Sequence, residues 1–347
     1  MSPRYRDDLE RALAASPTLN ALSGKTILIT GATGLIGTFL TDSLTLANER
    51  LECPMRIWAL CRNAQTARRR YCHAECVNII SQDVSLPMKD LPQADYIVHA
   101  ASNAHPLAFS ADPVGTMMAN ILGTKNLLEH LREQACGRLL FVSSGEIYGE
   151  NPNIPDGFSE DDFGKIDTMS PRACYPESKR AAEALCASYG KQYGVDSVTA
   201  RLCYVYGPTI TAANSRADAQ FLRKALAGED IVLKSAGSQV RSYCYAADVV
   251  SALLTLLLRG ETGQAYNVAN RACTHSIREY AETLAALAGV SVTFDLPPEA
   301  ERQGYSKVSR AVQNPARLEA LGWKALYSLR DGLQNTLNIL REQGGAT

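Results

Sequence analysis

The sequence predicts an α/β protein in which helices cover both faces of a parallel β-sheet, a doubly wound arrangement. Three observations carry this prediction. Short apolar runs rich in β-branched residues alternate with segments of helical periodicity. The runs are apolar at nearly every position, so neither face of such a strand is expected to meet water. A glycine-rich segment directly follows the first strong run, which places a candidate ligand site at the carboxyl ends of the strands.

The first 206 residues contain most of these elements. A short amphipathic helix is expected within Ser2–Leu22, and Ser16-Pro17 and Ser23-Gly24 interrupt the chain before the first strand. Helices fill most intervals between the runs, as right-handed crossovers between parallel strands require. We expect strands at Lys25–Thr30, Arg56–Leu60, Val77–Ile80, Tyr96–Ala100, Leu139–Ser143 and Ser197–Leu202, and helices at about Gly34–Ala47, Gly115–Glu133 and Tyr175–Tyr193.

The pattern changes after Gly207-Pro208, where loops such as Thr209–Ala217 and Pro297–Ser309 become longer and strands become shorter. We interpret this region as a smaller α+β lid that packs over the crevice. The predicted division is an N-terminal helical extension at 1–22, a sheet domain at 23–206 and a substrate-binding region at 207–347, with 241–270 returning to the sheet domain. Helices are expected at Ala217–Ala227, Ala246–Leu258, Ser276–Ala288 and Leu329–Leu340.

Composition and charge exclude several classes of protein. Lysine and arginine total 35 and aspartate and glutamate 36, a net charge of −1. This balance argues against a nucleic-acid-binding protein and against attraction to an acidic membrane surface. The longest uncharged stretches, Thr26–Thr41 and Tyr96–Ala111, carry Gly, Pro or His and are too short to span a bilayer. We therefore expect neither nucleic acid nor membrane as a partner.

The cysteines indicate a reducing compartment. The ten cysteines lie singly on apolar segments, as Cys186, Cys203 and Cys244 do, and the charged stretch Arg4–Arg11 leaves no apolar core for a secretory signal. We expect reduced thiols and a cytoplasmic location. Cys72-His73 with Cys76 has a spacing that zinc could use, but no second ligand pair follows, so we expect no metal.

The segment Thr30–Gly37, TGATGLIG, is a candidate phosphate cradle. The first glycine permits a tight turn, the second lets the backbone approach a pyrophosphate, and the third allows the helix to pack closely on the strand. The start of the helix then offers free N–H groups to the phosphates. A purely structural glycine turn is the alternative. The position after a first strand favours an NAD(P)-binding Rossmann domain, with contacts from Gly31, Thr33, Gly34, Leu35, Ile36 and Gly37.

The choice between NAD and NADP is expected at the end of the second strand. No carboxylate stands there to bind a ribose 2′-hydroxyl, whereas Arg62 follows Cys61 and favours tolerance of a 2′-phosphate. We therefore predict NAD or NADP, with a slight preference for NADP, although Arg62 could equally be an exposed arginine. Asp83, after the third run, is a candidate partner of the adenine; a surface turn is the alternative.

Four residues are candidates for catalysis. Tyr175 and Lys179 stand one helical turn apart and share a face. Because an unperturbed tyrosine has a pKa near 10, a neighbouring ammonium and a positive nicotinamide are expected to favour the phenolate. Ser144 and Glu146 end the strand run before this helix, which predicts a hydroxyl and a carboxylate at the rim of the crevice. A capped strand end with a surface acid is the plainer alternative.

In these motifs the chain resembles the extended short-chain dehydrogenase/reductase family of nucleotide-sugar enzymes, the NAD-dependent epimerases and dehydratases, over about residues 23–340. Within that family, the sequences SPRACYPESKRAAE (170–183) and Gly237-Ser238-Gln239-x-Arg241 are similar to UDP-glucuronate decarboxylases. The other matching pieces are TGATGLIG, His99-Ala100-Ala101-Ser102, Asn120-x-x-Gly123-Thr124, SSGEIYG (143–149), Tyr175-x-x-x-Lys179, Arg201 with Tyr206-Gly207-Pro208, and Leu321-Gly322-Trp323.

The resemblance implies a role for each matching residue. Ser144 would bond the sugar 4-hydroxyl, Tyr175 would act as base, and Lys179 would hold the nicotinamide ribose. Glu146 matches a glutamate shared by decarboxylases and dehydratases. Arg241 matches an arginine on the nucleotide diphosphate, and Arg310 falls where decarboxylases keep an arginine near the C5 carboxylate. Ala100 and Ala101 would lie at the cofactor, and Ser102, His105 and Tyr204 at the substrate.

The sequence departs from the family pattern at two positions of the sugar pocket. Gly145 stands where decarboxylases usually have Ser and 4,6-dehydratases usually have Asp, and Tyr204 stands where the family commonly has Asn. The resemblance thus implies a tightly bound cofactor and a transient 4-keto nucleotide sugar, most closely as in UDP-glucuronate decarboxylation. 4-Epimerisation, 4,6-dehydration and net NADPH-dependent reduction of a keto-sugar stay open. A homodimer built on 115–133 and 175–193 is expected from the same resemblance.

Overall fold

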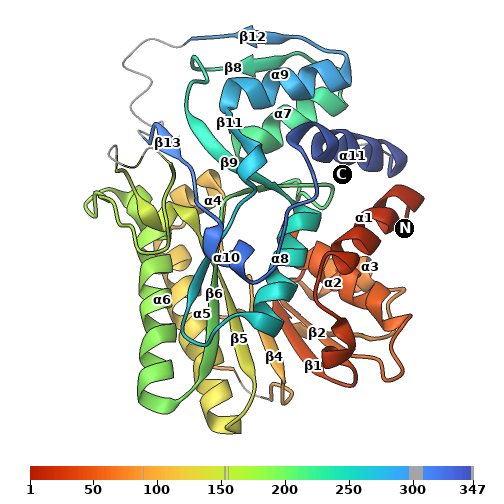
Figure 1. Cartoon of the computed structure of the whole chain (residues 1–347), viewed down its shortest axis with the longest axis vertical. Coiled ribbons are helices and arrows are strands. Elements are labelled where there is room, and N and C mark those ends of the chain that lie inside the picture. Colours follow the sequence, from red (N-terminus) through yellow and green to blue (C-terminus); the bar gives the residue numbers. More distant parts are fainter. Residues whose placement is uncertain (89, 152–153, 155, 297–307, 345–347) are drawn as a thin grey trace.

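A computed structural model describes residues 1–88, 90–151, 154, 156–296 and 308–344. Its core is a parallel seven-stranded sheet with the strand order β10-β6-β5-β4-β1-β2-β3 (Figure 1). The order reverses between β4 and β1, so the crevice of a doubly wound sheet opens at the carboxyl ends of these two strands. The strands are β1 (Thr26–Thr30), β2 (Arg56–Cys61), β3 (Val77–Ser81), β4 (Tyr96–His99), β5 (Arg138–Ser144), β6 (Asp196–Leu202) and β10 (Ala265–Val268).

Helices cover both faces of this sheet, because its strands are apolar on both sides. Ile27 and Ile29 of β1 join the apolar cluster of one face, whereas Leu28 joins the cluster of the other face. Helices α2 and α8 pack on the first face with α1 outside them, and α5 and α6 pack together on the second. The helices are α1 (Pro3–Ala14), α2 (Leu35–Asn48), α3 (Ala64–Tyr71), α5 (Pro113–Gln134), α6 (Cys174–Tyr193) and α8 (Ala246–Arg259).

The remaining elements gather at one end of the sheet, over the crevice (Figure 1). Strand β9 (Val240–Tyr245) is their centre and pairs with β7, β11 and β13, while β8 and β12 form a separate pair. The short strands are β7 (Tyr204–Tyr206), β8 (Ile231–Leu233), β11 (Thr274–Ser276), β12 (Val292–Phe294) and β13 (Arg310–Ala311), and the helices are α4 (Pro106–Ala111), α7 (Ala217–Leu226), α9 (Ile277–Ala288), α10 (Ala316–Ala320) and α11 (Leu329–Glu342).

The N-terminal helix is tied to the last helix of the chain. The buried carboxylate of Asp8 on α1 accepts hydrogen bonds from the hydroxyls of Tyr245 and Tyr327, and from Asn335 Nδ2 on α11 at 2.8 Å. Tyr5 on the same helix donates to Asp42 Oδ2 of α2 at 2.7 Å. These bonds satisfy two carboxylates that burial would otherwise penalise, so α1 is an integral part of the fold.

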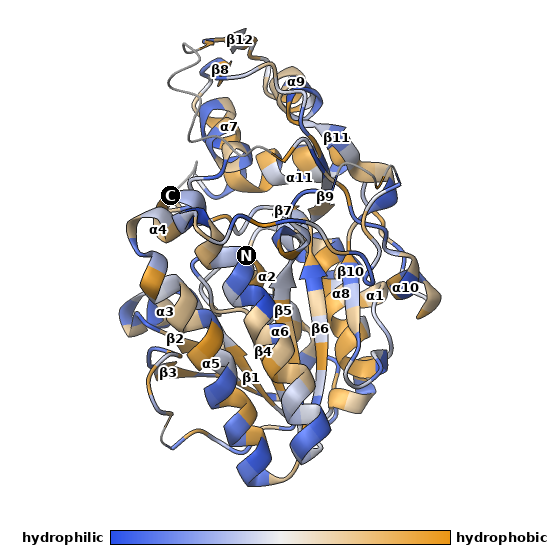
Figure 2. Ribbon diagram, turned by 90° about the vertical axis from the view of Figure 1, so that its left-hand side faces the viewer, coloured by the Kyte–Doolittle hydropathy of each residue, from blue (hydrophilic) through white to orange (hydrophobic). Residues whose placement is uncertain are grey.

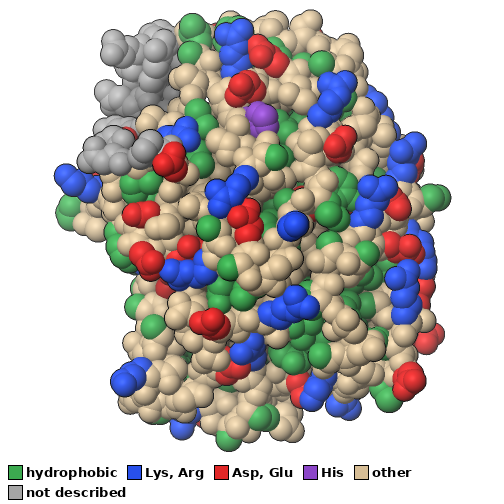
Figure 3. Space-filling model, viewed as in Figure 1, with side chains coloured by type: hydrophobic (Ala, Val, Ile, Leu, Met, Phe, Trp, Pro, Cys, Tyr) green, Lys and Arg blue, Asp and Glu red, His purple; other side chains and the backbone are tan. Residues whose placement is uncertain are grey.

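The predicted fold class is confirmed, and the long helices begin and end within a few residues of their predicted bounds. Strand β10, which none of the expected strands covers, extends the sheet beside β6. The division of the chain at residues 22 and 206 stays a prediction, and residues 297–307 of the expected loop lie outside the described residues. No helix in the described part is long and apolar enough to cross a membrane, and opposite charges intersperse on the face in Figure 3.

Candidate active site

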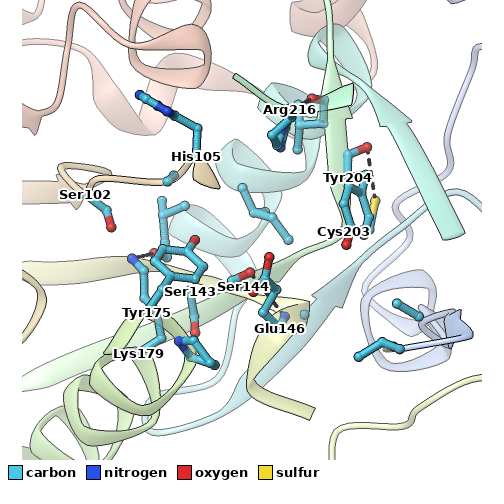
Figure 4. Close-up of a pocket in the computed structure, with 18 of the residues that line it drawn as sticks. Ser102, His105, Ser143, Ser144, Glu146, Tyr175, Lys179, Cys203, Tyr204 and Arg216 are labelled. Atoms are coloured by element: carbon cyan, nitrogen blue, oxygen red, sulfur yellow. Dashed lines mark hydrogen bonds between the residues drawn. The ribbon is translucent and has the colours of Figure 1, made fainter. Parts of the chain in front are cut away.

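A cavity of about 640 Å³ opens at the carboxyl ends of the central strands. Figure 4 shows Tyr175 and Lys179 together on α6, with Ser144 and Glu146 beside them and Tyr204 and Arg216 farther along the pocket. The cavity brings together most of the residues predicted from sequence. Its lining includes Gly31, Gly34, Leu35, Ile36, Gly37, Ala100, Ser102, His105, Ser144, Glu146, Tyr175, Lys179 and Tyr204.

The glycine turn leaves no room for side chains. A Cβ on Gly37 would lie 2.2 Å from the carbonyl oxygen of Gly31, and a Cβ on Gly31, whose φ is +67°, would lie 2.8 Å from the Ala100 carbonyl. Both clashes are with backbone, which cannot move aside. The Oγ of Ser102, next along the same edge, is buried without a hydrogen-bond partner among the described residues. A bare backbone cradle at a helix start with an unpaired hydroxyl nearby fits a dinucleotide.

Four of the predicted cofactor residues lie outside the cavity lining. Thr33 lies within the turn itself, and Ala101 donates its N–H to Thr30 Oγ1 at 3.1 Å. Arg62 is exposed and donates to Asn103 Oδ1 at 3.4 Å. Burial alone would raise the pKa of Asp83, but hydrogen bonds from Ser85 and the charge of Arg62 hold it below its usual value. Arg62 and Asp83 thus interact at the edge of the sheet, and their roles stay predictions.

Tyr175 and Lys179 are buried, and their environment differs from the expected one. Burial raises the pKa of Tyr175 to about 12, the charge of Glu146 adds to this rise, and hydrogen bonding to Ser144 opposes it. Burial also lowers the pKa of Lys179 to about 7, and its Nζ donates to the Val142 carbonyl at 2.7 Å. In this low-dielectric setting desolvation dominates both groups. That the ammonium and a bound nicotinamide together favour the phenolate stays a prediction.

Aromatic stacking holds the Tyr175 ring in place. Phe109 of α4 stacks on it with ring centroids 5.6 Å apart and an interplanar angle of 20°. Arg172 lies over the other ring of this pair, 5.5 Å from the Phe109 centroid, and also approaches Glu146 Oε2 at 3.5 Å. Arg172 thus links the stacked rings to the carboxylate. The phenol oxygen is the polar end of an otherwise apolar stack, so it is the part of Tyr175 available for chemistry.

A buried ion pair supports the strand end that carries Ser144. Arg201 Nη2 lies 2.8 Å from Glu183 Oε2 of α6, and Glu183 Oε1 accepts from the hydroxyl of Ser143 at 2.5 Å. Arg201 also donates to Tyr148 at 3.0 Å and to the Glu160 carbonyl at 2.7 Å. Because every charge in this group is paired, the cost of burying it is offset. The group joins β5, β6 and α6 directly beneath the candidate catalytic residues.

The predicted substrate residues occupy different places. Tyr204 lines the cavity, and the guanidinium of Arg241 lies 5.6 Å from its ring centroid. Arg241 itself is buried outside the lining and donates to the carbonyls of Val240 and Val308. His105 lines the cavity and bonds Ser215 Oγ at 3.1 Å. Arg310 lies exposed on β13, also outside the lining, so the structure does not bring it together with the others.

Sequence reasoning missed several polar residues of the pocket, among them Arg216, Lys165 and Gln313. Arg216 lines it with a buried Nε that finds no partner among the described residues. Lys165 and Gln313 line it as well. Arg216 and Lys165 lie in long loops without periodicity, so no pattern marked them. Gln313 fills the space beside Gly145, where an added Cβ would lie 2.7 Å from its Oε1, and only the departure at Gly145 hinted at such a neighbour.

Fold and cavity together define a dinucleotide-binding α/β enzyme with a Ser-Tyr-Lys group at its crevice. The model of the NAD dependent epimerase/dehydratase family matches residues 27–269, and the chain belongs to this family. UDP-glucuronic acid decarboxylase 3 of Arabidopsis thaliana is 32% identical over 310 residues, 88% of this chain and 86% of that protein. UDP-glucuronic acid decarboxylase 1 of Xenopus tropicalis is 31% identical over 344 residues, 97% and 78% of the two chains.

A solved structure of similar fold is the UDP-glucose 4-epimerase of Thermus thermophilus in complex with NAD. It is 27% identical, with a TM-score of 0.75 over 91% of this chain and 99% of that one. The resemblance to the extended short-chain dehydrogenase/reductase family is confirmed by these findings. The family is NAD-dependent, which agrees with the predicted dinucleotide cofactor.

Proposed function

We propose that this protein is a UDP-glucuronate decarboxylase that works through a transient 4-keto sugar. The observation that carries the proposal is the meeting of Ser144, Glu146 and Tyr175 in one cavity beside the glycine turn. The relatives named UDP-glucuronic acid decarboxylase support the choice of substrate. The glycine turn and Lys179 would hold the dinucleotide, and so would Ser102, which the resemblance had placed at the substrate.

The first step is oxidation of the C4 carbinol. Tyr175, as its phenolate, would accept the proton of the 4-hydroxyl while a hydride leaves C4 and a ketone forms. NAD⁺, when bound, would accept that hydride, return it in the last step and contribute the positive charge that favours the phenolate. Ser144 would orient the 4-hydroxyl through its own Oγ. The stacked Phe109 would keep the phenol at that position.

The ketone makes the C5 carboxylate a β-keto acid. The bond from C5 to the carboxyl carbon would break, CO₂ would leave, and the electron pair would form an enolate whose oxygen lies on C4. Ser144 and the protonated Tyr175 would stabilise that oxygen as hydrogen-bond donors. C5 would then gain a proton from solvent, through a water molecule that Glu146 would orient. Reduction of C4, with Tyr175 returning its proton, would complete a redox-neutral cycle.

The test is direct. Purified protein is examined for bound cofactor by its absorbance, then incubated with UDP-glucuronate while CO₂ and the nucleotide product are measured. We expect CO₂ and a UDP-pentose in equal amounts, without net consumption of NAD(P)H. Protein that carries cofactor and binds UDP-glucuronate but releases no CO₂ would contradict the proposal.

One observation favours 4-epimerisation as a second candidate. Arg310, expected beside the C5 carboxylate, lies exposed and outside the cavity, and an epimerase has no need to orient that group for bond cleavage. The same incubation separates the two, because an epimerase yields the C4 epimer without CO₂. Stoichiometric NADPH consumption would instead indicate a keto-sugar reductase. A 4,6-dehydratase is disfavoured because Gly145 offers no side-chain acid.

The finer properties are also proposals. Arg62, exposed at the end of β2, supports tolerance of NADP beside NAD.

Exposed Val114, Met118 and Leu122 share one face of α5, and Figure 2 shows α5 beside α6 on the outside of the molecule. This face supports a homodimer, testable by sedimentation. All ten cysteines are free thiols, which supports a cytoplasmic location. Asp83 and Arg241 keep their proposed roles.

A further inference from the structure

Gln313 is a buried amide at the rim of the cavity. It lies between β13 and α10, is 5% exposed, and lines the cavity beside Gly145. Its backbone is held from two sides: its N–H donates to Ser242 Oγ at 3.1 Å, and it bridges to Phe158 of the opposite segment. A side chain anchored in this way has one well-defined position.

The orientation of the Gln313 amide is fixed by two hydrogen-bond acceptors, a backbone carbonyl and the side chain of Asn267. Gln313 Nε2 donates to the Arg201 carbonyl at 3.0 Å and to Asn267 Oδ1 at 2.8 Å. Asn267 cannot turn its own amide over, because its Nδ2 donates to the carbonyls of Phe158 and Asn314. Carbonyl oxygens only accept, so both amides have a single satisfactory assignment. The nitrogen of Gln313 must face inward and its oxygen must face the other way.

Gln313 Oε1 is therefore the atom presented at the cavity. No described residue donates a hydrogen bond to it, and it is not among the buried polar atoms that lack a partner. It is therefore accessible from the cavity. A Cβ on Gly145 would lie 2.7 Å from Oε1 and 2.8 Å from Cδ. Moving the amide aside would break its two inward hydrogen bonds. The glutamine amide therefore occupies the space that a side chain at position 145 would need. An amide oxygen only accepts, so a donor is the partner that it needs.

We propose that Gln313 determines substrate specificity by accepting a hydrogen bond, through Oε1, from a hydroxyl group of the sugar bound beside Ser144 and Glu146. This inference rests on the proposed function, which places the sugar at those two residues. A hydroxyl supplies the proton that Oε1 lacks, whereas a carboxylate at the same point would meet a second acceptor and be repelled. The C5 carboxylate of the substrate would then face the cationic part of the lining, where Lys165 and Arg172 lie.

The test compares affinities for the sugar and for the nucleotide alone. Binding of UDP, UDP-glucose and UDP-glucose analogues that each lack one sugar hydroxyl is measured in the Tyr175→Phe background, so that no ligand is consumed. With Gln313→Ala we expect about a tenfold loss of affinity for UDP-glucose, the effect of one neutral hydrogen bond, and less than a twofold change for UDP. For one deoxy analogue the loss should vanish, because its missing hydroxyl is the partner.

A second variant guards against simple destabilisation. Gly145→Ala leaves every polar group of Gln313 in the chain but displaces its amide, so it should cost UDP-glucose affinity and spare UDP. Gln264→Ala removes an exposed amide outside the cavity lining and should change neither affinity. Equal losses for UDP and all sugars, or no loss in both variants, would overturn the inference. If the parent protein binds no UDP-sugar at all, the proposed function fails instead.

Discussion

The two halves of the cavity are built by different means. The cofactor half is built on the turn from Gly31 to Gly37, where a Cβ on either outer glycine would strike main-chain atoms. The sugar half is made of side chains from β5, α6, β7 and the segment after β13. Backbone geometry tolerates almost no change, whereas a set of side chains can be exchanged one by one. The chemistry of this fold can therefore vary while its cofactor stays the same, and the following experiments test that contrast.

The largest effect is expected in the cofactor half. In Gly37→Ala the new methyl group would lie 2.2 Å from the Gly31 carbonyl oxygen and 2.8 Å from the Ala32 Cα, and relieving this overlap should cost about 3 kcal/mol or more. Calorimetry should show a lower Tm, and the purified variant should lack cofactor absorbance. Gly190→Ala is the matched control, because its methyl group would make an ordinary 3.5 Å contact. A Gly37→Ala protein with normal cofactor content would contradict the backbone argument.

The second effect belongs to the sugar half. Tyr175→Phe removes one oxygen and keeps the ring stacked on Phe109. Loss of the general base should lower kcat by roughly 10²–10⁴-fold, with Tm and bound cofactor unchanged. Tyr193→Phe, an exposed tyrosine at the far end of the same helix, should leave kcat unaltered. Near-normal turnover by Tyr175→Phe would exclude the proposed chemistry.

A smaller effect should appear as a shift in pH dependence. The negative charge of Glu146 adds to the burial that raises the pKa of Tyr175. Glu146→Gln removes that charge, so the pKa of Tyr175 should fall and the phenolate should form at lower pH. The ascending limb of the pH–rate profile should therefore move to lower pH. The plateau value of kcat should fall by about tenfold or more, because Glu146 no longer assists proton transfer to C5.

Glu177→Gln is the control for that experiment, since its carboxylate pairs with Arg180 at the start of the same helix. It should leave the profile in place. A Glu146→Gln profile that stays put or moves to higher pH would show that this carboxylate does not act on Tyr175.

The smallest effect is expected at the edge of the cofactor half. Arg62 is exposed and makes one weak side-chain hydrogen bond, so Arg62→Ala should leave stability unchanged. If the guanidinium meets a 2′-phosphate, the Kd for NADP should rise a few-fold while that for NAD stays constant, because an exposed pair of charges contributes about 1 kcal/mol or less. Equal changes for the two cofactors would remove the preference for NADP. Arg259→Ala serves as an exposed control outside the cavity.

The cofactor half of the cavity could be predicted from the sequence more completely than the sugar half. The glycine turn was predictable because its requirement is local: a turn, a close approach and a helix start within eight residues. Tyr175 and Lys179 were predictable as neighbours because helical spacing places them on one face. The direction of the Tyr175 pKa was not, since it depends on burial under Phe109, which comes from α4 much earlier in the chain. Gln313 and Arg216 were missed for a similar reason, as only the folded chain brings them to Gly145 and Tyr204.

The hydrogen bonds of Asp8 have a consequence for the order of folding. Its partners Tyr245, Tyr327 and Asn335 lie more than two hundred residues farther along the chain. Contacts between segments so far apart in sequence form at a high cost in loop-closure entropy. We therefore expect them to form late, after α1 has docked on the neighbouring α2 through Tyr5 and Asp42.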